Sequence, residues 1–68
     1  MILVGIKGQI TSESLKGWTV IVQDDRKNTG GYLVILKNAN EQYDEWVGDY
    51  KDLEKLFDTR EWQVAWGK

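Results

Sequence analysis

The sequence contains no cysteine and no histidine among its 68 residues. A disulfide framework and thiolate metal sites are therefore excluded, and the commonest general base and metal ligand is missing. Positive charge is not in excess either, because nine basic residues stand against eleven acidic ones and leave a net charge of −2. This balance argues against constitutive binding to nucleic acid or to an anionic membrane.

Long hydrophobic runs are also absent, since no stretch approaches the ~18 consecutive apolar residues that a transmembrane helix needs. The apolar start of the chain lacks a basic leader and is too short for a secretory signal, so we expect it to form a buried first strand. A chain without cysteine and without such a signal is expected in the cytoplasm.

The apolar content of 41% argues against disorder and predicts one small domain, residues 1–68. Its core has to come largely from aromatic side chains, of which there are four Trp, three Tyr and one Phe. Each of them can bury roughly 150–250 Å². Trp is costly to hide completely in so thin a domain, so we expect at least one Trp to stay partly exposed.

Runs of alternating or continuous apolar residues predict five strands. The expected strands cover residues 2–7, 18–23, 32–36, 42–47 and 62–66. Residues 32–36 are apolar on both sides, which predicts a central strand covered on both faces. The charged segment before them ends in Gly30 and Gly31, which is typical of a hairpin turn.

A short helix is predicted over residues 50–58. Asp49 can cap its first turn, and Leu53, Leu56 and Phe57 recur at the spacing of one helical face. The resulting order of four strands, one helix and a last strand predicts an α+β fold. We expect a small, mostly antiparallel sheet of four to five strands with the helix packed on one face.

The residues present do not match the patterns of a catalytic site or of a metal site. Paired carboxylates such as Asp24 and Asp25 could do acid–base work, but so short a chain scarcely forms both a core and a deep site. A calcium loop beginning at Asp24 fails because Arg26 and Thr29 occupy positions that require an acidic residue and a glycine. We therefore expect no catalytic residue, no metal and no cofactor.

Charge is distributed unevenly along the chain. Residues 1–40 carry five basic and three acidic side chains, whereas residues 41–61 carry three basic and eight acidic ones. Aromatic anchors inside an acidic rim suit the capture of a basic protein, because rings supply contact area and carboxylates steer the encounter. We expect these groups on one outer face. The expected contact patch consists of Tyr43, Asp44, Glu45, Trp46, Asp49 and Asp52.

Other interpretations of the same residues stay open. The carboxylates could imitate the spaced phosphates of a nucleic acid and occupy the groove of a nuclease or another nucleic-acid-binding protein. The aromatic residues could instead all belong to the core, with the acidic residues serving only solubility. A third interpretation is a structural domain that forms a homodimer or larger homo-oligomer through an unpaired edge strand.

Five short segments resemble small bacterial immunity-type proteins, which are acidic inhibitors often encoded beside a toxin. They are GWTV (17–20), GGYLV (30–34), DEWV (44–47), DLEKLF (52–57) and WQVAW (62–66). The resemblance implies a one-to-one protein inhibitor without catalytic residues, built from a few antiparallel strands and a helix. Its partner would be a toxin, a nuclease or another basic protein. Inhibitors of host defence encoded by phages have the same size and charge.

Overall fold

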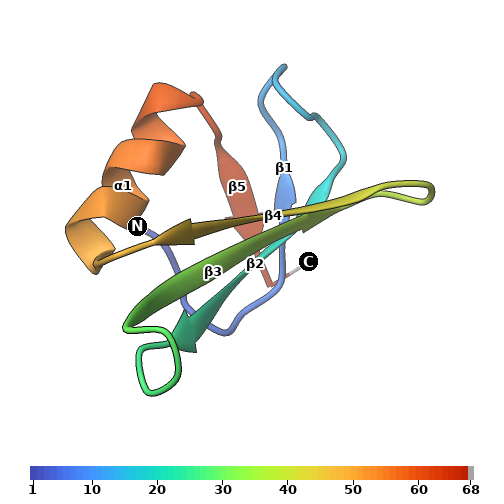
Figure 1. Cartoon of the computed structure of the whole chain (residues 1–68). Helices are drawn as coiled ribbons and strands as arrows, with labels where there is room; N and C mark the ends of the chain where they lie inside the picture. The colour runs from blue at the N-terminus through green and yellow to red at the C-terminus, as the bar shows by residue number, and fades with distance from the viewer. Residues whose placement is uncertain (68) are drawn as a thin grey trace.

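One sheet of five antiparallel strands and one helix make up the part of the chain that the computed structural model describes, residues 1–67 (Figure 1). The elements are β1 (Gly8–Ile10), β2 (Thr19–Asp25), β3 (Gly31–Lys37), β4 (Gln42–Val47), α1 (Tyr50–Thr59) and β5 (Val64–Trp66). The strand order is β4-β3-β2-β1-β5, and every neighbouring pair is antiparallel. The predicted α+β fold is thereby confirmed.

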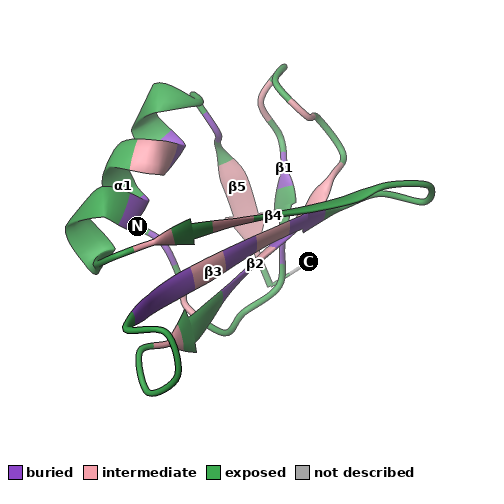
Figure 2. Ribbon diagram, in the orientation of Figure 1, coloured by how far each residue is buried: buried purple, intermediate pink, exposed green. Residues whose placement is uncertain are grey.

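The core lies on one face of the sheet, which we call the inner face. Val20 and Val22 of β2 stand opposite Leu36 and Val34 of β3 in the register of the two strands, and all four side chains are buried. Alternate residues of a strand point to opposite faces, so this pattern assigns every other residue of β2 and β3 to the core. Figure 2 shows buried segments along β2 and β3 and on the helix.

The opposite, outer face of the sheet is only partly covered. Ile21 of β2 and Leu33 and Ile35 of β3 are half-buried there. β3 does lie between two neighbouring strands, as its apolar sequence predicts, but the expectation that both of its faces are covered is wrong. The single helix covers the inner face, and no element of residues 1–67 lies over the outer one.

The first strand is not where the sequence predicts it. Residues 2–7 form no strand; the chain turns at Val4 and Gly5, and the Gly5 amide donates to the Val22 carbonyl at 2.7 Å. β1 follows at Gly8–Ile10, in a segment expected to be a loop, because it pairs with both β2 and β5. From the apolar start, Ile2 is buried in the core and Val4 packs at its margin.

Helix α1 forms as its capping and periodicity predict. Oδ1 of Asp49 accepts a hydrogen bond of 2.7 Å from the Asp52 amide and caps the first turn. Leu53 is fully buried, Phe57 is nearly so, and Leu56 packs at the margin of the core. The helix connects the two edge strands, β4 and β5. In residues 1–67, no helix is long and apolar enough to cross a membrane.

The four tryptophans differ in exposure. Trp62 is buried although it precedes β5 instead of belonging to it, Trp18 and Trp66 are half-buried, and the Trp46 side chain is 51% exposed. This confirms the expectation that at least one Trp stays partly exposed. Trp46 lies on the outer face, where its indole packs over Gly31 and its Nε1 donates to the Thr29 hydroxyl at 2.8 Å.

The two glycines before β3 serve different purposes. Gly30 has a φ of +85°, as a hairpin turn requires, whereas Gly31 leaves room for β4. A methyl group at Gly31 would overlap the Val47 carbonyl oxygen and come within 2.7 Å of the Trp46 ring. The second glycine therefore fixes how closely Trp46 can lie against the hairpin.

We predict that Gly31→Ala lowers the free energy of unfolding by about 1–3 kcal/mol, the usual cost of overpacking. Gly48→Ala is the matched control, because a methyl group there meets the Trp46 ring at 3.6 Å, an ordinary contact, and should change the free energy by less than about 0.5 kcal/mol. Urea unfolding followed by fluorescence measures both. Equal effects of the two substitutions would contradict the close approach at Gly31.

Candidate functional site

The expected contact patch does not form one surface, because strand β4 turns its residues to alternate faces. Tyr43 and Glu45 lie on the inner face, opposite buried Leu36 and Val34 of β3. Asp44 and Trp46 lie on the outer face. The prediction that the carboxylates and rings of this segment share one outer face is therefore wrong for β4.

The inner-face members of the expected contact patch are used within the molecule. The Tyr43 ring stacks on Trp18, with centroids 5.6 Å apart and planes 16° apart. Its hydroxyl donates to Glu41 at 2.7 Å, and this hydrogen bond raises the pKa of Tyr43 above its ordinary value. Oε1 of Glu45 accepts from the Arg60 guanidinium at 2.6 Å, an ion pair that joins β4 to the end of α1.

Trp46, Asp49 and Asp52 lie near the turn between β4 and α1. Asp52 and Trp46 line the same shallow groove, about 450 Å³ in volume, together with the cationic side chains of Lys55 and Arg60. Asp49 is occupied by its capping role. This groove carries charges of both signs, so it is not the acidic rim that the sequence predicts.

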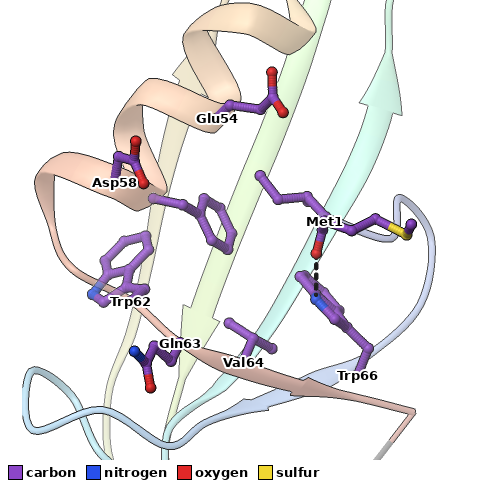
Figure 3. Close-up of a pocket in the computed structure, with 9 residues that line it drawn as sticks. Met1, Glu54, Asp58, Trp62, Gln63, Val64 and Trp66 are labelled. Carbon is purple, nitrogen blue, oxygen red and sulfur yellow. Dashed lines mark hydrogen bonds between the residues drawn. The ribbon is translucent and has the colours of Figure 1, made fainter.

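Acidic and aromatic side chains do meet elsewhere, at a pocket between α1 and β5 of about 370 Å³ (Figure 3). We call it the α1–β5 pocket. In Figure 3, Glu54 and Asp58 lie on the helix side, and Trp62, Val64 and Trp66 lie on the opposite side. Its principal lining residues are Glu54, Phe57, Asp58, Trp62, Val64 and Trp66.

The aromatic walls of the α1–β5 pocket are fixed by contacts with one another and with the backbone. Phe57 meets Trp62 edge to face, with centroids 5.3 Å apart and planes at 89°. It lies almost parallel to Trp66, with centroids 6.2 Å apart and planes at 26°. Nε1 of Trp66 donates to the Met1 carbonyl at 3.0 Å, which sets the orientation of that indole.

The two carboxylates of the pocket are placed unfavourably for the helix itself. Glu54 and Asp58 are four residues apart on one side of α1, where like charges cost about 0.2–0.5 kcal/mol. Asp58 also lies in the last turn, which has no basic residue, at the negative end of the helix dipole. Within residues 1–67, neither carboxylate forms an ion pair.

Sequence reasoning missed the α1–β5 pocket, although part of its signal is visible. Glu54 and Asp58 flank Phe57 on the predicted helix, and Trp62 and Trp66 share a face of the predicted last strand. Which helix side meets which strand depends on the pairing of β5 with β1, and local sequence gives no sign of that pairing.

Catalytic and metal-binding chemistry gains no support from the geometry. The carboxylate of Asp24 accepts two side-chain hydrogen bonds and a backbone one from Arg26, which lower its pKa and keep it ionised. In residues 1–67, no group of three or more acidic side chains is arranged to hold a metal ion.

Comparisons of the chain with models of protein families, with curated proteins and with solved structures give no match. The resemblance to immunity-type inhibitors stays a prediction from the sequence. The geometry of the α1–β5 pocket and the distribution of charge are the observations that bear on function.

Some carboxylates of the expected contact patch stabilise the fold, and others make no contact that the fold needs. Asp49 and Asp44 are one example of each. Asp49→Ala removes the helix cap and should lower the free energy of unfolding by about 1 kcal/mol. Asp44→Ala, at an exposed position on the outer face, should change it by less than about 0.5 kcal/mol. Urea unfolding measures both, and an equal loss of stability would contradict the capping role.

Proposed function

We propose that the protein is a small acidic binding module that attaches to a basic surface of a partner protein, in the manner of an inhibitor or immunity protein. The observation that carries the proposal is the α1–β5 pocket, where aromatic walls adjoin two carboxylates that no cation of residues 1–67 neutralises. Rings of this kind supply binding energy at protein interfaces, and carboxylates supply steering and register.

The wider distribution of charge supports the same proposal. Of the eight acidic residues between positions 41 and 61, Glu45 alone forms an ion pair within the described chain. Asp52, Glu54 and Asp58 are exposed along α1. A surface of one charge sign raises the rate of encounter with an oppositely charged partner and loses this effect in salt.

The proposed contact surface differs from the one that the sequence predicts. It is centred on α1 and β5 instead of β4, and Tyr43, Glu45 and Asp49 serve the fold. The partner class is unchanged: a toxin, a nuclease or another protein whose basic groove binds nucleic acid. Spaced carboxylates would occupy such a groove in place of phosphates. A cytoplasmic partner fits the absence of cysteine, and no catalytic role is proposed.

We expect the double reversal Glu54→Lys with Asp58→Lys to abolish capture of basic proteins from a lysate of the source cell. The control, Glu41→Lys with Asp44→Lys, makes the same change in net charge away from the α1–β5 pocket and should retain capture. Mass spectrometry identifies the captured proteins. For a partner found in this way, the pocket variant should associate about tenfold more slowly at low salt. An unchanged set of captured proteins would contradict the proposal.

A second candidate function, self-association, is favoured by the outer face of the sheet. Ile21, Leu33, Ile35 and the exposed half of Trp46 lie there without cover, and β4 is an edge strand. Edge strands and apolar sheet faces pair readily with another chain. The protein would then be a structural subunit of a homo-oligomer.

Light scattering at micromolar concentration separates the two candidate functions. We expect a monomer, because an inhibitor that binds one-to-one needs no second copy. A stable dimer that Ile35→Glu dissociates, while the pocket reversal leaves it intact, would favour the structural subunit instead.

A further inference from the structure

We infer that the α1–β5 pocket receives the ammonium group of one lysine side chain from the partner protein. The inference rests on the proposed function and adds the chemical group that is recognised. The pocket volume of about 370 Å³ falls in the range of ligand sites, ~300–1,000 Å³.

The protein already contains one complete arrangement of this kind, on its surface at the end of α1. The Arg60 guanidinium lies over the Trp62 ring, 5.5 Å from its centroid, and pairs with the Glu45 carboxylate at 2.6 Å. A cation, an aromatic face and a carboxylate therefore occur together at the end of α1. Cations are attracted to ring faces by the ring quadrupole and gain further from a nearby anion.

The α1–β5 pocket, which Met1 also lines, contains ring faces and carboxylates without a cation from the described chain paired to them. Phe57 and Trp66 supply ring surface, and Glu54 and Asp58 supply carboxylates that pair with no cation of residues 1–67. Their mutual repulsion and the dipole of α1 both disfavour this arrangement in the free protein. A bound cation relieves both effects at once, so the pocket favours a positively charged occupant.

The presence of two separate carboxylates favours ammonium over guanidinium. Glu54 and Asp58 are four residues apart on α1, a helical rise of about 6 Å between their backbone positions, so a compact group with three rotatable donors can bond to both side chains. A guanidinium instead prefers both oxygens of a single carboxylate in its own plane. The four-carbon stem of lysine can pack along Phe57 and Val64 while its head stays between the carboxylates.

The test uses a named probe and needs no partner protein. The acetylated and amidated pentapeptide Gly-Gly-Lys-Gly-Gly is titrated into the ¹⁵N-labelled full chain. We expect saturable shifts of the Trp66 indole N–H signal and none at Trp46, which lies on the outer face. The same pentapeptide with norleucine in place of lysine keeps the stem, lacks the charge and should cause no saturable shift.

Variants of nearly equal shape test the carboxylates. Glu54→Gln with Asp58→Asn should weaken binding of the lysine peptide about tenfold, while Asp44→Asn leaves it unchanged. The pocket variant should unfold at the same temperature as the wild type or higher, because the substitutions remove like charges. Weakened binding together with unchanged or raised stability therefore excludes unfolding as the cause.

Three outcomes would overturn the inference. They are equal binding of the norleucine peptide, tighter binding of the corresponding arginine peptide, and the absence of a saturable shift at Trp66. Failure here is distinguishable from failure of the proposed function. The lysine peptide could fail to bind while the Glu54→Lys, Asp58→Lys variant still loses its basic partner. That result would contradict the lysine pocket and would support the proposed binding of a basic protein.

Discussion

Helix α1 packs Leu53 and Phe57 against the inner face of the sheet, and this contact closes the core. Without a disulfide, a domain of this length typically has about 3–5 kcal/mol of net stability. Removing one large buried aromatic side chain typically costs as much. The side of α1 that faces the sheet is therefore fixed by stability alone, and the positions of its exposed carboxylates follow from it.

The sequence predicts correctly those elements that have a clear local pattern, either the alternation of a strand or the periodicity and cap of a helix. β4 begins and ends at the predicted residues, α1 extends one residue further than expected, and β2 and β3 are each predicted to within two residues at every end. The errors concern the short strands. β1 and β5 have three residues each, and they are strands because Gly8 pairs with Trp66 and Ile10 with Val64. That pairing joins the two ends of the chain, so no local window contains it.

The candidate site was misplaced for a reason that the sequence itself contains. Residues 43–46 are neighbours in the chain, but consecutive residues of a strand point to opposite faces, so four of them cannot share a surface. The helix was expected to bury Phe57, and it does. The partners of Phe57 could not be predicted, because Trp66 reaches it only through the pairing of β5 with β1.

The C-terminal end of α1, with its cap residue Arg60, carries charged side chains that serve the fold on one side and the proposed function on the other. On one side Arg60 pairs with Glu45 and covers Trp62, so a local set of opposite charges joins the helix to β4. On the other side, Glu54 and Asp58 line the α1–β5 pocket with Phe57 and Trp66. Neither carboxylate forms an ion pair with a cation of residues 1–67. If stability alone determined these residues, a basic side chain at position 58 would suit both the helix dipole and Glu54. The acidic residue at position 58 disfavours the end of the free helix, and the proposed cation site would give this residue a function.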